Sequence, residues 1–255
     1  MIVLNGELKE RETVNLDSGF YFGRGLFETM LVKGKPLFLN EHLDRLNKGL
    51  TSIGIERKVS TGEVMDAVKK LQCCDKVLKL TVTEENVLFT SRENRDTNEH
   101  YKRGFSATIS SVQRNATSPL TYLKSLNYLD NILEHERCRR DGFDEALFLN
   151  GEGSLTEGSL SNIFFIKSGS IYTPSLSCGL LNGIVRSFVI NRFDVIEGRF
   201  SIHDLQSADS AFLTNSVIGI MKLTSFDGTC FGESDKVREI YDAFIEECKS
   251  QAASL

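Results

Sequence analysis

The sequence predicts an α+β protein of two domains. Short apolar strands alternate with turn residues in both halves, amphipathic helical patterns lie between them, and a polar stretch without periodicity falls near the middle. The chain has 255 residues, of which 40% are hydrophobic and 25% charged. These are ordinary values for a globular protein, and the length is sufficient for one large or two modest cores.

The first third of the chain reads as two hairpins followed by helices. Alternation of apolar and polar residues around Asn5-Gly6 predicts the first hairpin, and Gly34-Lys35 predicts the second. Asn40 is placed to cap a helix whose apolar residues recur every three or four positions. Another helix is predicted to start at Ser60 or Thr61.

Three strands and a linker follow. Residues 76–85 and 86–93 are predicted to pair as strands, and residues 104–112 look like one more. The stretch QRNATSP is the best linker candidate. We therefore expect an N-terminal α+β domain over residues 1–112, an interdomain loop over 113–120 and a C-terminal domain over 121–255.

The second half begins with a helical pattern and continues with short strands. Leu126, Leu129, Ile132 and Leu133 predict one apolar helix face, and Gly142 ends that helix. The later elements are predicted from short apolar runs and turn signals. They are strands in EALFLN, NIFFIKSG and SIYTP, a helix from Asn182-Gly183, two strands in ADSAFLTNSVIGIMKL and a last helix from about Ser234.

Composition argues against several classes of protein. A net charge of -5 and a pI near 5.5 do not suit a nucleic-acid binder. No apolar run approaches a membrane span and the N-terminus has no signal-peptide pattern, so we expect a cytoplasmic protein. The six cysteines and four histidines show no metal-ligand spacing. We expect reduced, mostly buried thiols and no metal site.

Lys124 and Glu157 are the most informative residues of the chain. Lys124 lies just before a helical pattern, and Glu157 follows in TEGSLSN, a loop of small hydroxyl residues. Pyridoxal phosphate (PLP) needs such a pair, because an amine holds its aldehyde as a Schiff base and a carboxylate keeps its ring nitrogen protonated. The alternative is a solvated lysine and a solvated loop, which is the usual reading of either residue alone.

Other residues could complete a PLP site. Ser159, Ser161 and Asn162 would supply hydroxyl and amide groups near Glu157. The helix that opens at 182–185 offers backbone N–H groups for a phosphate, although a glycine at a helix start is usually only a cap. Arg45 suits bidentate phosphate binding, and its alternative is a surface ion pair with Glu41.

Several motifs together resemble the class IV (fold type IV) PLP enzymes. These motifs are GLFETMLV, FLNEHLDRL, KSLNYLDNIL, DEALFLN, LTEGSLSNIFF, LLNGIVR and LTNSVIGI, in the family's order and spacing over about residues 5–225. The family includes branched-chain and D-amino acid aminotransferases and 4-amino-4-deoxychorismate lyases. The resemblance implies a small N-terminal α/β sandwich domain, a larger C-terminal pseudo-barrel domain, and a homodimer with the active site at the domain interface.

The resemblance also implies residue roles. Lys124 resembles the Schiff-base lysine, Glu157 the carboxylate facing the pyridine nitrogen, and Arg45 the phosphate arginine. The remaining implied cofactor contacts are the Tyr128 hydroxyl, the loop residues Ser161 and Asn162, and the backbone amides of Ile184 and Val185.

Within the family, three features favour the lyase. GLFETM and LTNSVIGI resemble the lyase forms of these motifs, and Asn215 in the second is a candidate substrate-binding residue. Arg92 and Arg103 lie where lyases place groups for substrate carboxylates. Two segments depart from the family pattern. Arg24 stands in FGRG where Asp is frequent, and MKL follows NSVIGI where the family has a form that contains proline. The implied reaction releases pyruvate and 4-aminobenzoate, with Lys124 as the catalytic base and Thr29 as a candidate proton donor.

Two other functions are compatible with these residues. Transamination of a D-amino or branched-chain amino acid uses the same lysine and carboxylate but needs a keto-acid acceptor. A non-catalytic metabolite-binding module with this fold would hold no cofactor on Lys124. For the lyase and for the aminotransferase, the expected partner is a small-molecule substrate, and no nucleic acid or membrane is expected.

Overall fold

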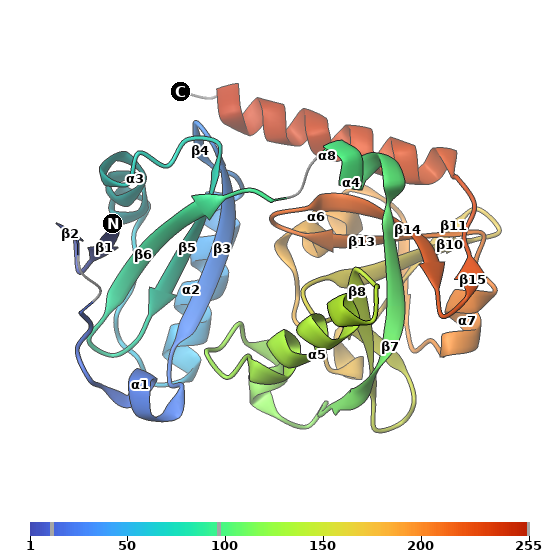
Figure 1. The fold of residues 1–255 in the computed structure, drawn as a ribbon, viewed down its shortest axis with the longest axis horizontal. Coiled ribbons are helices and arrows are strands. Elements are labelled where there is room, and N and C mark those ends of the chain that lie inside the picture. Colours follow the sequence, from blue (N-terminus) through green and yellow to red (C-terminus); the bar gives the residue numbers. More distant parts are fainter. Residues whose placement is uncertain (11–12, 96–97, 254–255) are drawn as a thin grey trace. The chain divides into compact units, whose positions relative to one another are not determined.

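The computed structural model describes residues 1–10, 13–95 and 98–253 of the chain, which divides into two compact units. The first unit comprises Met1–Arg95, Leu123–Asn127 and Cys248–Leu255, and the second comprises Asp96–Tyr122 and Tyr128–Glu247. Figure 1 shows the elements of both. These bounds differ from the predicted division, because the strand at 105–114 pairs with strands of the second unit and 123–127 returns to the first.

The first unit is built on one antiparallel sheet. Its six strands follow the order β2-β1-β6-β5-β3-β4. In chain order its elements are β1 (Ile2–Leu4), β2 (Glu7–Lys9), α1 (Ser18–Phe22), β3 (Leu26–Lys33), β4 (Lys35–Pro36), α2 (Leu39–Ser52), α3 (Thr61–Lys70), β5 (Lys76–Val82) and β6 (Val87–Glu93).

The turns and caps of this unit follow local chemistry. The β1–β2 hairpin turns at Asn5 and Gly6, both with positive φ, as a two-residue hairpin turn requires. Ser60 and Glu63 form the capping box of α3, which confirms the predicted start of that helix. The predicted cap at Asn40 is wrong. The N-cap residue of α2 is Phe38, which has a left-handed conformation and whose side chain makes no capping hydrogen bond.

The two faces of the first sheet differ. One face carries Leu26 and Met30 and packs against Leu46 and Leu50 of α2, which lies behind β3 and β5 in Figure 1. Side chains alternate along a strand, so the next residues in sequence lie on the opposite face. Phe27 and the residues that share its face on β3 and β5 therefore point away from this core.

The second unit contains the larger sheet. Its elements include 3-10 turns at Pro119–Tyr122 and Leu176–Cys178. The others are α4 (Asn98–Arg103), β7 (Phe105–Arg114), α5 (Leu129–Arg140), β8 (Glu145–Asn150), β9 (Leu155–Gly158), β10 (Asn162–Lys167), β11 (Ser170–Pro174), α6 (Ile184–Arg192), β12 (Val195–Gly198), α7 (Ile202–Gln206), β13 (Ser210–Asn215), β14 (Gly219–Phe226), β15 (Thr229–Cys230) and α8 (Asp235–Ala253), whose last residues belong to the first unit.

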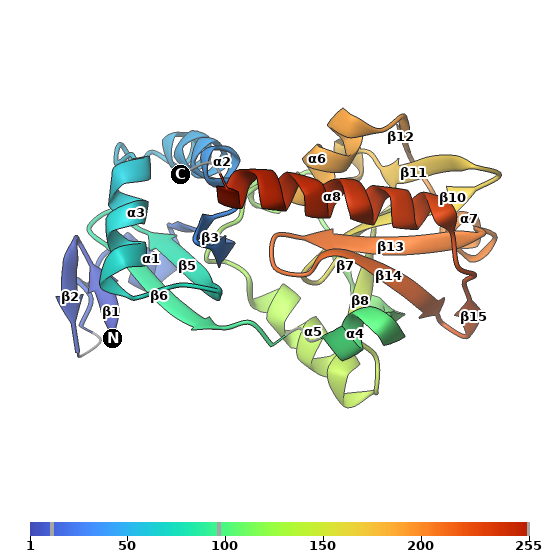
Figure 2. The same cartoon turned by 90° about the horizontal axis from the view of Figure 1, so that it is seen from above.

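The larger sheet curls. Its order is β12-β11-β10-β13-β14-β7-β8-β9, with β15 paired to β14. β7 runs parallel to both β14 and β8, and β9 at the end of this order contacts β10. In Figure 2, α8 runs beside α6 and over β13, and the rings of Phe188 and Phe244 join these two helices. The α+β two-domain fold predicted from the resemblance is confirmed.

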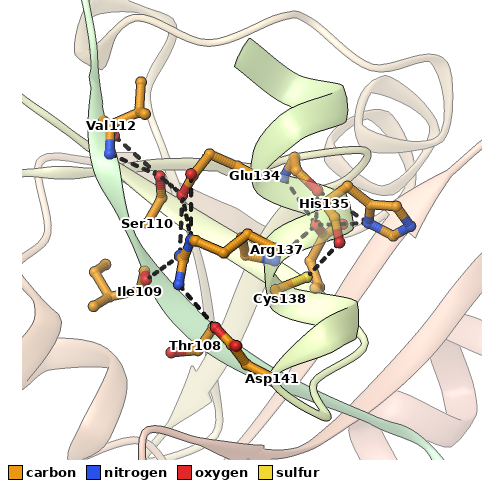
Figure 3. A network of polar contacts seen from close by, with 12 residues as sticks. Thr108, Ile109, Ser110, Val112, Glu134, His135, Arg137, Cys138 and Asp141 are labelled. Carbon is orange, nitrogen blue, oxygen red and sulfur yellow. Dashed lines mark hydrogen bonds and ion pairs between the residues drawn. The ribbon is translucent and has the colours of Figure 1, made fainter. Parts of the chain in front are cut away.

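Helix α5 buries polar side chains and exposes apolar ones. Asn131, Glu134 and Cys138 are buried, whereas Leu129, Ile132 and Leu133 are exposed. The apolar residues of the predicted face therefore lie on the exposed side of the helix, and Leu126 lies outside it. Figure 3 shows the polar side of α5, where Glu134 accepts a hydrogen bond from Ser110 and pairs with Arg137.

Cysteines and hydropathy add two observations. All six cysteines are free thiols. Cys73, Cys138 and Cys178 are buried, and Cys74 and Cys230 are exposed. Burial raises the pKa of the Cys138 thiol to about 12, which keeps it protonated and unreactive. Among the residues that the structure describes, no helix combines the length and the hydrophobicity needed to cross a bilayer.

Candidate active site

The Lys124 segment belongs to the sheet of the first unit. The backbone N–H of Phe27 donates to the Lys124 carbonyl at 2.9 Å, and that of Leu126 donates to Gly25 at 3.0 Å. Ser125 bridges Leu26 on β3. Lys124, which the sequence predicted to lie just before a helix, is therefore held along the edge of β3 by backbone hydrogen bonds.

Two amines approach one aromatic ring on the open face of this sheet. The Lys124 Nζ lies 4.5 Å and the Lys79 Nζ 4.8 Å from the Phe27 ring centroid. Both are cation–π distances. Thr29 pairs with Lys79 across β3 and β5, so the candidate proton donor lies on the same face. Partial burial of the amine and the nearby Arg92 guanidinium lower the pKa of Lys79, although much of this residue is exposed.

Arg92 belongs to the neighbouring strand β6. It pairs in register with Val77, two residues before Lys79, and its guanidinium donates to the Glu93 carbonyl at 3.0 Å. Because Val77 and Lys79 are two apart on one strand, Arg92 lies on the same face as Lys79. This predicted substrate residue is exposed.

Arg45 is held by a buried carboxylate on β3. Its guanidinium donates to both Glu28 oxygens, at 2.8 and 2.7 Å, and its side chain is 19% exposed. The His42 Nδ1 lies 2.6 Å from the same carboxylate. The solvated surface reading with Glu41 is thus wrong, because Glu28 binds Arg45 from inside the sheet.

The neighbours of Glu28 explain why its carboxyl stays ionised in the buried triad that it forms with Arg45 and His42. Burial raises the pKa of the Glu28 carboxyl, but Arg45 and His42 outweigh it and bring that pKa to about 2. Burial lowers the pKa of His42, with the positive charges of Arg45 and Lys124 acting in the same direction and Glu28 opposing them. The His42 Nε2 has no hydrogen-bond partner among the described residues.

In the second unit, Glu157 ends a buried strand beside Arg114. Glu157 Oε1 lies 3.1 Å from the Arg114 guanidinium, and the Leu181 N–H donates to Oε2 at 3.1 Å. The Arg114 guanidinium in turn stacks 4.0 Å from the Phe148 ring centroid. A carboxylate so placed can accept a hydrogen bond from a protonated ring nitrogen.

The residues around Glu157 hold one another. Tyr128 and Asn131 both donate to the Ser159 carbonyl, at 3.2 and 2.7 Å. The Ser161 hydroxyl donates to Glu145 at 2.7 Å, and the Asn162 amide donates to the Leu181 carbonyl at 2.9 Å. The structure therefore brings the predicted loop residues together around Glu157.

The start of α6 lies next to this loop. Gly183 is the N-cap, and a Cβ on it would lie 2.1 Å from Asn162 Oδ1, so a larger residue there would force the Asn162 side chain to move. Ile184 and Val185 are buried in the first turn of the helix. The unpaired N–H groups and the positive dipole end of such a turn suit a phosphate.

Two predicted substrate residues have structural partners. Arg103 forms a bidentate ion pair with Asp144, at 2.7 and 2.8 Å, which raises the pKa of Arg103. Asn215 caps the β13–β14 turn by accepting from Val217 and Ile218, both at 2.8 Å, and its amide donates to Leu160 at 3.0 Å. Both side chains therefore already have polar partners within the fold.

Sequence reasoning missed Glu28, Lys79, Arg114 and Glu145. Glu28 and Lys79 could have been found from the strand pattern, because each is a charged residue within a mostly apolar strand. Nothing near Arg114 or Glu145 in the sequence marks either residue, because their partners lie far away along the chain.

A cavity of about 490 Å³ lies elsewhere in the second unit, between α4, β14 and α8. It is lined by Tyr101, Phe231 and Tyr241 among others, and by none of the predicted site residues. The chemistry of the chain therefore points to the Lys124 and Glu157 regions and not to this cavity.

Comparison with known proteins identifies the family. The sequence profile of the class IV aminotransferases (Amino-transferase class IV) matches residues 25–226. The chain belongs to this family, whose members are PLP-dependent enzymes, either lyases or aminotransferases.

Individual relatives fall into both groups. The chain is 30% identical to an aminodeoxychorismate lyase of Bacillus subtilis, over 91% of this chain and 88% of the relative. It is also 30% identical to a putative branched-chain-amino-acid aminotransferase of Methanocaldococcus jannaschii, over 97% and 95%. A putative 4-amino-4-deoxychorismate lyase structure from Legionella pneumophila matches with a TM-score of 0.86 and 25% identity, over 94% of this chain and 97% of that one.

Proposed function

We propose that this protein is a PLP-dependent 4-amino-4-deoxychorismate lyase that releases pyruvate and 4-aminobenzoate, a step towards folate. The observation that carries the proposal is the pair of amines, Lys124 and Lys79, that both lie within cation–π distance of the Phe27 ring. A flat substrate ring with two carboxylates suits an aromatic surface flanked by cations. Similarity to the lyases of Bacillus subtilis and Legionella pneumophila supports the same choice.

Several of the predicted site residues would hold PLP. In the second unit, Glu157 would hold the proton of the ring nitrogen, the first turn of α6 at Ile184 and Val185 would bind the phosphate, and Tyr128 lies among the loop contacts. In the first unit, Lys124 would hold the aldehyde covalently and Arg45 would bind phosphate. The Gly183 contact with Asn162 fits a helix start kept open for an anion.

The proposed chemistry needs one proton to be moved. PLP, when bound, supplies a sink for the electrons left on the substrate carbon. Lys124 Nζ, released when the substrate amine takes its place on the aldehyde, would take the proton from the amine-bearing ring carbon of the substrate. The bond to the enolpyruvyl group breaks, the ring becomes aromatic, and the methylene of the departing group gains a proton from Lys124 or from the Thr29 hydroxyl. Atoms balance, because the proton lost by the ring carbon is regained in pyruvate.

Lys79 and Arg92 would bind the substrate carboxylates. They lie on the face that also carries Phe27 and Thr29, as strand register requires. Arg103 and Asn215 were expected to share this role, but their engagement with Asp144 and with the β13–β14 turn makes them weaker candidates. We therefore assign the substrate anions to Lys79 and Arg92.

Transamination is the second candidate function. It is favoured by the aminotransferase relatives, which match this chain as closely as the lyase does. It would use the same Lys124 and Glu157 with a D-amino or branched-chain amino acid and a keto-acid acceptor.

One experiment separates the two reactions. The PLP-loaded protein is incubated with 4-amino-4-deoxychorismate while pyruvate is followed, and separately with D-alanine or leucine plus 2-oxoglutarate while glutamate is followed. The proposal expects pyruvate from the first mixture. Glutamate from the second mixture, without pyruvate from the first, rejects the lyase assignment. A non-catalytic module would show no visible absorption band that depends on Lys124 in the purified protein.

A homodimer is part of the proposal. On α5, Leu129, Ile132 and Leu133 are 66%, 41% and 51% exposed, and this apolar stripe is unusual for the surface of a helix. A second copy of the chain would cover it. Sedimentation of the wild type and of Leu133→Glu tests this, since the variant should dissociate. A wild-type monomer at micromolar concentration would contradict it.

A further inference from the structure

A buried carboxylate lies under the loop that follows Glu157. Glu145, the first residue of β8, is 3% exposed. Its carboxylate accepts hydrogen bonds from the Ser159 hydroxyl, from the Ser161 hydroxyl at 2.7 Å, and from the backbone N–H groups of Ser159 and Leu160 at 2.9 and 3.2 Å. Four of the donors to one side chain therefore come from three consecutive loop residues.

Contacts of its own backbone also hold the 158–161 loop in this conformation. Gly158 donates to the Ser161 carbonyl at 2.7 Å, and Ser159 donates to the Ala146 carbonyl at 2.8 Å. A Cβ on Gly158 would lie 2.4 Å from Ser161 Oγ and 2.9 Å from Glu145 Oε2. The loop backbone is thus packed directly onto the Glu145 carboxylate.

Both residues that flank this loop reach the segment before α6. Glu157, before the loop, accepts from the Leu181 N–H, and Asn162, after it, donates to the Leu181 carbonyl. Leu181 precedes Ile184, the first residue of α6, by three positions. A shift of the loop would therefore move the Glu157 carboxylate and the start of α6 together.

The charge on Glu145 matters for this arrangement. The donors named above are neutral, and the His135 imidazole lies close by, with Nδ1 4.0 Å from Glu145 Oε1. A buried carboxylate is costly unless its oxygens are hydrogen-bonded, and hydrogen bonds to a charged group are stronger than those between neutral groups. The carboxylate and the loop donors therefore fix each other.

We propose that Glu145 is a positioning residue for the cofactor. It sets the geometry of the 158–161 loop, and through that loop it aligns the Glu157 carboxylate with the anion-binding start of α6. The proposal rests on the proposed PLP chemistry, but not on the choice between lyase and aminotransferase.

The test compares Glu145→Gln with a matched control, Glu134→Gln. An amide keeps one acceptor oxygen and turns an N–H₂ group toward loop donors, so we expect the dissociation constant for PLP to rise about 10- to 100-fold. Glu134 is also a buried carboxylate of the second unit, but it accepts from Ser110 at 2.6 Å and from Arg137 at 3.0 Å and not from the loop (Figure 3). Its variant should lose thermal stability with unchanged PLP affinity.

Affinity is measured by titrating PLP into the apoprotein and following absorbance. A second readout does not involve PLP: amide hydrogen exchange of residues 158–162 and 181–185 in the apoprotein should be faster in Glu145→Gln and unchanged in Glu134→Gln. Unchanged exchange in Glu145→Gln, or equal loss of PLP affinity in both variants, overturns the proposal. If the wild type binds no PLP, the proposed function fails, while the exchange readout still decides the role of Glu145.

Discussion

The two units hold their candidate groups in different ways. In the first unit, Lys124, Thr29 and Lys79 project from strands or a strand edge of one sheet. In the second, Glu157 stands at the end of a strand, next to a turn and a helix start that side-chain hydrogen bonds hold in place. Groups on strands are fixed by the backbone ladder, whereas groups at turns depend on particular side chains. The two sets should therefore respond differently to substitution.

The largest expected effect is on Lys124. Lys124→Ala removes the group proposed to hold PLP and to move the proton, so we expect turnover to fall by about 10⁴-fold. The backbone hydrogen bonds of this position do not involve the side chain, so thermal stability should change little. Lys48→Ala, at an exposed position of α2, is the control for loss of a lysine. Retention of a tenth of wild-type turnover would contradict the assignment.

Glu28→Gln tests the buried triad of the first unit. The folded-state pKa of about 2 lies below the ordinary 4.5, so ionised Glu28 contributes stability above pH 4.5 that is lost as the pH falls through 2. We expect the variant to lose about 3 kcal/mol of unfolding free energy at pH 7. The difference from wild type should shrink between pH 4.5 and 2.

Urea unfolding at pH 7 and at pH 3 measures this difference. Asp66→Asn, which breaks an exposed ion pair with Lys70, is the control and should cost less than about 0.5 kcal/mol. A Glu28→Gln difference that does not depend on pH would show that packing, not charge, holds the triad.

Glu157→Gln tests the carboxylate of the second unit. The amide cannot hold a proton on a ring nitrogen as a carboxylate does, so we expect kcat to fall by about 10²-fold while PLP still binds. Glu152→Gln, an exposed residue of the turn after β8, should leave kcat unchanged. Steady-state kinetics with the PLP-loaded variants measure both. An unaltered kcat for Glu157→Gln would remove this residue from the site.

Lys79→Met separates substrate binding from chemistry. The side chain keeps its length and loses its charge, so KM should rise about tenfold with kcat nearly unchanged. Lys33→Met, which removes an exposed partner of Asp75 on β3, is the matched control. A fall in kcat at constant KM would instead give Lys79 a role in proton transfer.

The smallest expected effect lies away from both sets. Ser60→Ala removes the capping box of α3 and should cost about 1 kcal/mol of unfolding free energy. Kinetics should remain those of the wild type. Altered kinetics would indicate that small losses of stability in the first unit reach the site, and the results for Lys79 would then need the same correction.

The sequence predicted elements well where local patterns determine them. The Asn5-Gly6 hairpin, the Ser60 cap and the pairing of residues 76–82 with 87–93 are confirmed. Each depends on residues close together in the chain, so turn chemistry and alternation suffice. The motifs also placed the chain in its family, which the profile match over residues 25–226 confirms.

Predictions that depended on distant partners were less reliable. The helical pattern of α5 did not indicate that Glu134 and Asn131 turn inward, where Ser110 and the Ser159 carbonyl form hydrogen bonds with them. The alternative role considered for Arg45 was an ion pair with Glu41 on its own helix, but the observed partner, Glu28, comes from a strand. Periodicity measures hydrophobicity, and it does not register such polar pairs.

The distribution of thiols offers a molecular ruler. Cys74 in the first unit and Cys230 in the second are exposed, while Cys73, Cys138 and Cys178 are buried. With Cys248 replaced by serine, a donor dye and an acceptor dye attached at the two accessible sulfurs would report, by energy transfer, how the spacing of the units responds when substrate is added.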